Sequence, residues 1–319
     1  MGSMAKEKMK KKKGEKITPA ILWKQRWLLV MSVPFVIWLI IFKYIPLWGW
    51  TMAFQEVKPA TFALPIWERT WVGFQNFTDA FKDRLFTQTL INTLGVSFLD
   101  IAVGTIAAIA FAVLLNEMFF MKFKKVTQTI SYLPHFLSWI IVTGILHDAL
   151  SGTGIINELL VNFGILDQPL NFFAYPKYFW PIVAFANVWK ETGWNAIIYL
   201  SAITAIDPSL YEAANMDGAG RWARIKYVTL PGIKPTIMIL LLMNVGNVLN
   251  AGFEIQYLLG NGLVQSVSQT IGIYVLKWGI SQNDFSIGTA AGIFKSLVSI
   301  ILIVIANQIA KRNGEERLF

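Results

Sequence analysis

Six long runs of apolar residues constrain what this chain can fold into. They lie near residues 27–54, 89–115, 130–149, 178–205, 233–253 and 288–309. An apolar helix of about 20 residues crosses the ~30 Å hydrocarbon core of a bilayer, and within that core a segment must satisfy its own backbone hydrogen bonds. The runs therefore predict an all-α membrane protein in which six transmembrane helices form one domain over residues 27–310.

The composition agrees with a bilayer protein and removes several kinds of chemistry. Hydrophobic residues make up 55% of the 319 positions and charged residues 15%, whereas a soluble domain carries about 25% charged residues. The absence of cysteine excludes disulfides, cysteine-ligated zinc and a thiol nucleophile. His135 and His147 stand without a set of acidic partners, so we expect packing or hydrogen bonding from them, no metal site and no catalytic residue.

Basic residues are concentrated before the first apolar run. Nine Lys and Arg residues fall within residues 1–26, which indicates a solvated tail beside anionic lipid headgroups and not a nucleic-acid surface. Cytoplasmic segments of membrane proteins are richer in Lys and Arg than outer ones. With both termini in the cytoplasm, the inside segments hold eighteen such residues and the outside segments six. Without the first tail, nine against six still favours cytoplasmic tails over 1–26 and 311–319.

A polar segment, residues 207–232, separates the fourth and fifth apolar runs on the predicted cytoplasmic side. Asp207 is expected to cap a short helix that begins at Pro208, and Gly218 is expected to supply a turn. A second short helix is expected over 221–230, ended by the Pro-Gly pair that closes the segment. Two short helices that meet at a bend would suit docking into a groove on a separate protein.

The fifth apolar run contains polar side chains at helical spacing. Asn244, Asn247 and Asn250 recur every three residues, which keeps them near one face of a helix. An amide without a partner is costly in hydrocarbon, so this stripe must face protein, water or solute. Hydrogen bonding between helices and contact with a sugar are both open interpretations.

The fourth apolar run brings together polar and aromatic side chains: Asn187, Trp189, Lys190, Glu191, Trp194 and Asn195. Ionisable residues inside a span mark functional sites by default. Lys190 and Glu191 point about 100° apart on a helix, so each is expected to need its own partner. The candidate solute path is this group together with Asn244, Asn247 and Asn250, and one or more of Asn187, Trp189, Trp194, Asn244 and Asn247 is expected to line it.

Seven positions of the polar segment match a family signature. They are Glu212-Ala213-Ala214, Gly218, Val228 and Leu230-Pro231, and only Val228 departs from the usual residue, which is Ile. With this spacing the chain resembles the permease subunits of bacterial binding-protein-dependent ABC importers. The resemblance implies that the surface coupled to an ATPase is formed by Glu212, Ala213, Ala214, Asp217, Gly218, Arg221, Leu230 and Pro231.

Looser matches lie elsewhere in the chain. The stretches Trp71–Phe77, Asn92–Leu94 and Asp217–Gly220 resemble carbohydrate-type permeases, particularly the branch for oligosaccharides and polysaccharide fragments that includes alginate importers. The resemblance implies a type I ABC importer permease fold in a bacterial inner membrane. It also implies the partners: a second homologous permease, two ATP-binding subunits, and an extracellular or periplasmic solute-binding protein that delivers the carbohydrate.

The sequence contains no phosphate-binding G-x-x-x-x-G-K-[ST] motif. We therefore expect no enzymatic activity and no cofactor in this chain, with ATP and Mg²⁺ used by the partner subunits. The alternative is a secondary transporter or channel driven by an ion gradient, with Lys190 and Glu191 as coupling groups. A membrane scaffold that moves nothing is a third interpretation.

Overall fold

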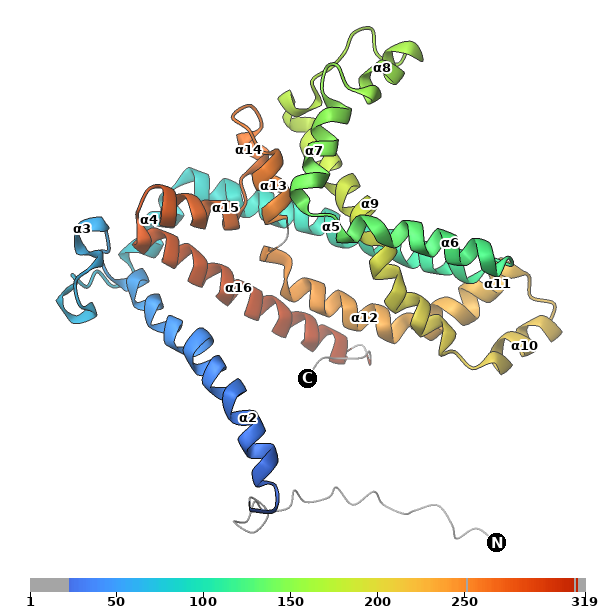
Figure 1. Ribbon diagram of the computed structural model, residues 1–319, viewed down its shortest axis with the longest axis horizontal. Helices are drawn as coiled ribbons and strands as arrows, with labels where there is room; N and C mark the ends of the chain where they lie inside the picture. Colours follow the sequence, from blue (N-terminus) through green and yellow to red (C-terminus); the bar gives the residue numbers. More distant parts are fainter. Residues whose placement is uncertain (1–22, 251, 313, 315–319) are drawn as a thin grey trace. The chain divides into compact units, whose positions relative to one another are not determined.

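The computed structural model describes residues 23–250, 252–312 and 314. The tails expected over 1–26 and 311–319 therefore lie largely outside the described residues. Across the part of the chain that is described, the secondary structure is helical, which confirms the all-α class (Figure 1).

The chain divides into two compact units, Met1–Thr51 and Met52–Phe319. Helix α2 (Arg26–Leu39) of the first unit continues as the π-helical stretch η1 (Ile40–Tyr44) and then as the 3-10 helix η2 (Ile45–Phe54), which ends within the second unit. Together they form the first of the expected spans.

Proline accounts for the change of helix type in this first span. Pro46 has no backbone N–H, and in a regular α-helix its ring would clash with the carbonyl group four residues earlier. The helix widens to π geometry just before this proline instead of stopping. The span stays continuous over the 29 residues of Arg26–Phe54, long enough to cross a bilayer.

The second unit is a set of helices joined by short connections. Its α-helices are α3 (Pro59–Phe62), α4 (Gln75–Lys82), α5 (Arg84–Asn116), α6 (Met121–Tyr132), α7 (Trp139–Leu150), α8 (Ile155–Asn162), α9 (Pro176–Thr204), α10 (Pro208–Met216), α11 (Arg221–Arg224), α12 (Leu230–Gly246), α13 (Phe253–Leu259), α14 (Gln265–Ser268), α15 (Ile271–Leu276) and α16 (Phe285–Arg312). The 3-10 and π-helical stretches are η3 (Ile66–Glu68), η4 (Leu133–Phe136), η5 (Phe172–Ala174), η6 (Ile225–Thr229), η7 (Val248–Asn250) and η8 (Lys277–Ser281).

Several helices have the length of a membrane span. Five helical stretches of the described residues are long and apolar enough to cross a membrane: Arg26–Phe54, Arg84–Asn116, Trp139–Asn162, Arg221–Gly246 and Phe285–Arg312. Helix α9, with 29 residues, has the length of a sixth. Its centre carries Asn187, Lys190 and Glu191, and these polar side chains lower its apolarity.

The third apolar run does not form one helix. A third span is present, but the expected bounds of 130–149 are wrong, because η4 interrupts the run and the membrane-length stretch is Trp139–Asn162. Pro134, within η4, lacks the N–H that a continuing α-helix would use. Ser138 then caps α7, its hydroxyl oxygen accepting from the Ile141 N–H at 3.3 Å.

The second short helix of the polar segment does not end where the sequence predicts. Pro231 was expected to end a helix over 221–230, but α11, η6 and α12 form one 26-residue helix, Arg221–Gly246. The π-helical stretch η6 lies immediately before Pro231, the same accommodation that occurs before Pro46. The polar segment from Arg221 onward is therefore one continuous helix with the fifth span.

The far end of the fifth span also differs from expectation. The predicted span over 233–253 is wrong beyond Gly246, where α12 stops. Asn247 leaves the helical conformation, and Gly252 has φ +74°, a left-handed backbone that favours glycine. Glycine and asparagine are weak helix formers, so the chain turns away here and starts α13.

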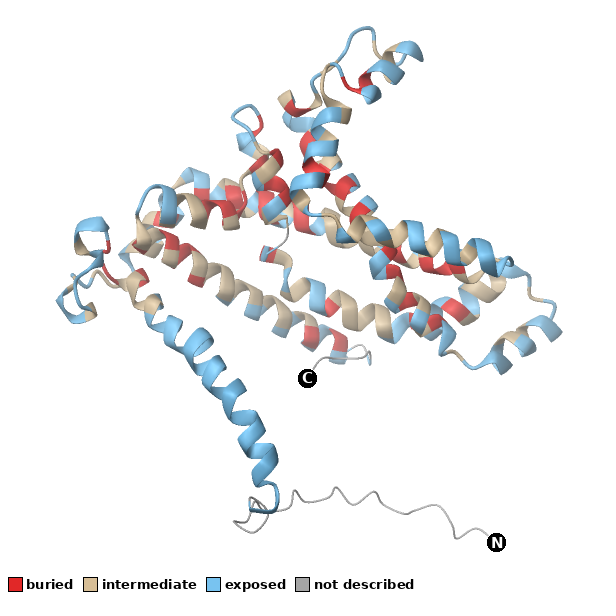
Figure 2. Ribbon diagram, viewed as in Figure 1, coloured by how far each residue is buried: buried red, intermediate tan, exposed pale blue. Residues whose placement is uncertain are grey.

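Helix α5 packs along α9, and the two share buried clusters with neighbouring helices. One cluster joins α5, α9 and α13 around Phe179 and Ile255, and another joins α5, α9 and α12 around Tyr199 and Ile233. Figure 2 shows buried residues on α9, α13 and α15. Because lipid is as apolar as these side chains, close packing and buried hydrogen bonds hold such helices together.

Two adjacent polar side chains tie α5 to a distant part of the chain. Asn92 Nδ2 donates to the backbone oxygens of Ser266 and Gln269, each at 2.9 Å. The Thr93 hydroxyl oxygen accepts from the Ile271 N–H at 2.9 Å. These bonds satisfy backbone groups at the ends of α14 and α15 that would otherwise be buried without partners.

Gly193 lies where α9 comes closest to α6. A Cβ added there would overlap the backbone oxygen of Ser131, so alanine must push the two helices apart. We expect Gly193→Ala to lower the stability by about 1–3 kcal/mol, measured as a lower thermal midpoint of the detergent-solubilised protein. Gly144→Ala in α7 is the matched control, because no atom lies within 4 Å of its Cβ position. Equal midpoints for the two variants would contradict the close contact.

Candidate functional site

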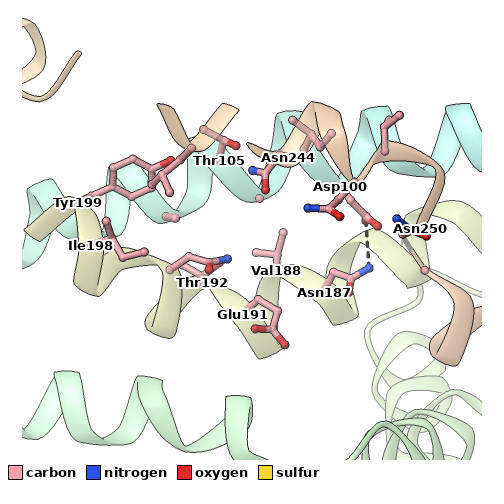
Figure 3. A pocket seen from close by; sticks show the side chains of 18 residues that line it. Asp100, Thr105, Asn187, Val188, Glu191, Thr192, Ile198, Tyr199, Asn244 and Asn250 are labelled. Carbon is pink, nitrogen blue, oxygen red and sulfur yellow. Dashed lines mark hydrogen bonds between the residues drawn. The ribbon is translucent and has the colours of Figure 1, made fainter. Parts of the chain in front are cut away.

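A polar cavity of about 430 Å³ lies between α5, α9 and the end of α12 (Figure 3). Its polar lining residues are Asp100, Thr105, Asn187, Glu191, Thr192, Asn195, Tyr199, Asn244, Asn247 and Asn250. Five of these ten side chains are amides, which can both donate and accept hydrogen bonds. The cavity therefore suits a ligand that presents both kinds of group.

The end of α12 supplies three of these amides. Asn244 lies in its last turn, Asn247 follows its end and Asn250 closes η7. Asn247 Nδ2 donates to a carbonyl oxygen one turn earlier at 3.1 Å, and the Ser97 hydroxyl of α5 donates to the Val248 carbonyl oxygen. Two carbonyl groups near the helix end thus accept hydrogen bonds from side chains.

Asp100 is a cavity residue absent from the expected solute path. It lies midway along α5, and Figure 3 shows Asn187 turned toward it from α9. Asn187 Nδ2 donates to Asp100 Oδ1 at 3.1 Å. The signal that could have found it is a carboxylate inside the otherwise apolar run 89–115, because ionisable groups in a span mark functional sites.

Lys190 and Glu191 pair with each other beside the cavity. Lys190 Nζ lies 2.9 Å from Glu191 Oε1 and donates to the His135 carbonyl oxygen at 2.7 Å. Glu191 Oε2 lies 2.7 Å from His135 Nδ1. The expectation of separate partners is therefore wrong, because η4 brings His135 against α9 and the long lysine side chain reaches back to the neighbouring carboxylate.

The two histidines have the packing and hydrogen-bonding roles expected of them. The His135 ring stacks on Trp194 with centroids 4.4 Å apart, and the His147 ring lies 4.5 Å from that of Phe173. Among the described residues, no group of three or more His, Asp or Glu side chains is arranged to hold a metal ion.

The structure brings most of the expected path residues together. Those that line the cavity are Asn187, Glu191, Asn195, Asn244, Asn247 and Asn250. The other three, Trp189, Lys190 and Trp194, do not line it. Lys190 is buried and paired with Glu191, the Trp194 ring stacks on His135, and Trp189 is exposed.

The bend expected in the polar segment is present. Asp207 Oδ1 accepts from the Ser209 N–H at 2.9 Å and caps α10, and this hydrogen bond lowers the pKa of the Asp207 carboxyl group. Gly218 has φ +74°, a conformation that a residue with a side chain rarely adopts. Glycine at this signature position therefore allows the chain to turn from α10 into α11.

The inner side of the bend is held to the segment that follows α5. Arg224 Nη1 donates to Asn215 Oδ1 at 2.8 Å, and Arg224 Nη2 lies 3.8 Å from Glu117 Oε2. The Arg221 guanidinium lies 4.3 Å from the centre of the Phe119 ring, a cation–π contact. These contacts connect α10 and α11 to each other and to the end of α5.

The outer side of the bend is exposed. Seven of the eight residues expected to couple to an ATPase are exposed and Ala214 is half-buried: Glu212, Ala213, Ala214, Asp217, Gly218, Arg221, Leu230 and Pro231. Met216 and Trp222, which the sequence analysis missed, are 89% and 83% exposed. Large apolar side chains exposed on either side of the turn indicate a docking surface, and their position in an otherwise polar segment was the available signal.

Comparisons with known proteins agree with this arrangement. Residues 100–314 match the family described as binding-protein-dependent transport system inner membrane component. The polygalacturonan/rhamnogalacturonan transport system permease protein YteP of Bacillus subtilis (strain 168) is 41% identical over 311 residues, covering 97% of this chain and 95% of that protein. Protein LplB of the same organism is 41% identical over 301 residues, covering 94% and 93%.

A solved structure is similar over almost the whole chain. It is the crystal structure of a bacterial alginate ABC transporter in complex with an alginate pentasaccharide-bound periplasmic protein, one chain of which is 36% identical with a TM-score of 0.85. The match covers 94% of this chain and 99% of that one. The helical arrangement around the cavity and the bend is thus shared with a transporter subunit.

The Lys190–Glu191 pair gives a stability prediction. Glu191→Gln leaves the buried Lys190 ammonium without its counter-charge. Because the Glu191 side chain is 30% exposed, we expect a loss of about 1–3 kcal/mol, less than for a fully buried pair, measured by thermal or denaturant unfolding in detergent. The double variant Lys190→Met/Glu191→Gln removes both charges and should recover most of that loss. A Glu191→Gln variant as stable as the parent would show that the pair does not hold α9 to η4.

Proposed function

Because this chain belongs to the binding-protein-dependent transport system inner membrane components, we propose that it is the membrane-spanning subunit of an ATP-driven importer for an oligosaccharide or polysaccharide fragment. The observation that supports this proposal most directly is the amide-lined cavity between α5, α9 and α12. A sugar presents hydroxyl groups that donate and accept hydrogen bonds, and amides can match both roles. The cavity volume, about 430 Å³, lies in the range of small-ligand sites.

The substrate class is supported by what the relatives carry. One relative is named for polygalacturonan and rhamnogalacturonan transport, and the similar solved transporter was crystallised with an alginate pentasaccharide on its periplasmic protein. We propose that this chain likewise passes a carbohydrate handed over by an extracellular or periplasmic solute-binding protein. The path residues proposed to contact it are the six expected ones that line the cavity, joined by Asp100.

The energy for transport must enter through partner subunits. The sequence has no phosphate-binding loop motif, so we propose that two ATP-binding subunits use ATP and Mg²⁺ while this chain has no enzymatic activity and no cofactor of its own. The exposed bend formed by α10 and α11, with Met216 and Trp222 beside the signature residues, is the proposed docking surface for one of them. A second homologous permease completes the transmembrane pathway.

We further propose a bacterial cell membrane as the location, with both termini in the cytoplasm. The excess of Lys and Arg in the segments assigned to the inside supports this orientation. The docking bend is then on the cytoplasmic side, where ATP is available.

In an alternating-access mechanism, the continuous helix of the fifth span would carry movement from the bend to the cavity. Arg221–Gly246 is one helix, so a displacement of the bend by the ATPase subunits would move Asn244 at the other end of the same rod. The cavity walls on α5 and α9 would then shift relative to α12, which changes the side from which the cavity is open.

An ion-driven secondary transporter is the alternative, with Lys190 and Glu191 as coupling groups. In the structure these two side chains satisfy each other and His135, an arrangement that also serves to hold η4 against α9. Uptake by the assembled importer that stops with vanadate supports the ATP-driven proposal, whereas uptake that follows a proton or sodium gradient supports the alternative.

The cavity assignment predicts which substitutions reduce uptake. Replacing Asn187, Asn244 or Asn247 with Ala should weaken solute transport roughly two- to tenfold each, because a lost hydrogen bond contributes about 0.5–1.5 kcal/mol. Trp189→Ala is the control on α9, since its ring does not line the cavity. Initial uptake rates into vesicles, normalised to protein amount, provide the measurement. Full uptake in all three asparagine variants would refute the path.

The docking bend gives a separate prediction. Trp222→Ala removes a side chain that is 83% exposed, so we expect unchanged thermal stability but at least a tenfold loss of the copurified ATPase subunit, as for a central aromatic residue of an interface. Trp67→Ala is the matched control, because Trp67 is 84% exposed on η3. Equal ATPase recovery in the two variants would show that the subunit binds another surface.

A further inference from the structure

A second, smaller cavity adjoins the first. It has a volume of about 360 Å³ and lies between η7, α15 and the middle of α16. Asn250 lines both cavities, so one amide stands at their common boundary. The polar groups around the smaller cavity are Asn250, Thr270, Lys295 and Ser296.

Lys295 is a cation inside a membrane-spanning helix. It is the eleventh residue of α16, Phe285–Arg312, so it lies about 15 Å along the helix from its first residue. Within the described part of the chain, its ammonium group makes no hydrogen bond and no ion pair. Charged groups at such a position normally pair with a counter-charge or with a substrate.

The surroundings of Lys295 contain a second unsatisfied group. Thr270 is 1% exposed, lines the same cavity, and its hydroxyl oxygen has no hydrogen-bond partner among the described residues. Gly292, one turn before Lys295, has no atom within 4 Å of its Cβ position, which leaves the space beside the ammonium open. A buried hydroxyl donor, a cation and an amide around one open space form a suitable set for a carboxylate.

The larger cavity has the opposite charge character. Its ionisable acidic side chains are Asp100 and Glu191, and the ammonium of Lys190 is turned away to Glu191 Oε1 and the His135 carbonyl oxygen. A sugar carboxylate would be repelled there unless a cation stood nearby. Lys295 lies on the other side of the shared residue Asn250 and can supply that cation.

We propose that the cavity around Lys295 is a carboxylate subsite, in which the Lys295 ammonium and the Thr270 hydroxyl bind a carboxylate group of an acidic sugar while neutral hydroxyl groups contact the amides of the larger cavity. The inference rests on the proposed function and narrows it to oligosaccharides that contain uronic acids. The interaction is a charge-assisted hydrogen bond, which is stronger than a neutral one.

A labelling experiment tests the charge of the subsite without requiring transport. The chain has no cysteine, so Ser296→Cys places the sole thiol of this subunit in the smaller cavity. In the assembled importer, an anionic methanethiosulfonate should label the thiol at position 296 faster than a cationic one does. Mass spectrometry of this subunit measures the two labelling rates. Adding Lys295→Met should lower the anion-to-cation rate ratio at least tenfold, because local charge of this kind concentrates counter-ions about 10- to 1,000-fold.

Thr105→Cys is the matched control for that experiment. Figure 3 shows Thr105 toward the opposite end of the larger cavity from Asn250, so its rate ratio should change little when Lys295 is replaced. If Lys295→Met leaves the anion-to-cation rate ratio at position 296 unchanged, the proposed subsite is overturned, because a partner subunit would then be neutralising the ammonium. Failure of both reagents to reach position 296 would also overturn it, because the cavity would then be closed to solute.

An uptake experiment tests the ligand class. The probes are trigalacturonate and its fully methyl-esterified form, which share one sugar chain but carry charged carboxylates in the first and neutral methyl esters in the second. Lys295→Met should reduce transport of the acid roughly ten- to hundredfold and leave the ester little changed, whereas equal effects on both would overturn the carboxylate assignment. If the unaltered importer carries no oligosaccharide at all, the proposed function fails, and the labelling ratio still decides whether an anion subsite exists.

Discussion

The end of α12 at the cavity wall is the constraint on which the site depends. A backbone that leaves helical geometry among membrane spans must have its polar groups satisfied by protein or by water in a cavity. Here the Ser97 hydroxyl donates a hydrogen bond to the Val248 carbonyl oxygen, and the Asn247 amide donates one to a carbonyl oxygen of the last turn. The same break places Asn244 and Asn250 at a cavity wall instead of in a helix that continues through lipid. Asn247 therefore serves two purposes, since it caps the interrupted helix and lines the cavity, while Asn244 and Asn250 add two further amides to the cavity lining.

The other end of the same helix explains how distant parts can act together. The π-helical accommodation at Pro231 keeps Arg221–Gly246 as one rod, so the exposed turn at Gly218 and the cavity share a rigid element. Arg224 also joins the bend to Glu117, just after α5. A force applied at the bend thus reaches two of the three cavity walls, α12 by helix continuity and α5 by the contact of Arg224. The third wall, α9, is joined to the bend through the short connection capped by Asp207.

The sequence predicted the features that depend on local chemistry. The apolar runs gave the helical class, Asp207 and Gly218 gave the cap and the turn of the bend, and the three-residue spacing of the asparagines placed them at one site. Features that depend on neighbouring helices could not be predicted in this way. Pro134 interrupts a helix while Pro46 and Pro231 only widen theirs, although each proline lies in or beside an apolar run. Lys190 reaches Glu191 because His135 arrives from η4, a tertiary contact that no spacing within α9 reveals.

The charges within the long helices differ chiefly in how completely the protein satisfies them. Lys190 and Glu191 neutralise each other and share His135, so their charges are used within the fold. Asp100 receives only the amide of Asn187 and retains capacity to accept further hydrogen bonds toward the cavity. Lys295 has no partner among the described residues, although it lies deep in α16 beside open space. An unsatisfied charge is costly in this environment. A charged group with partners in the protein holds helices together, whereas one with few or no partners is available to a ligand. By that criterion Lys190 is a structural residue, while Asp100 and Lys295 are the groups that we propose to face the solute.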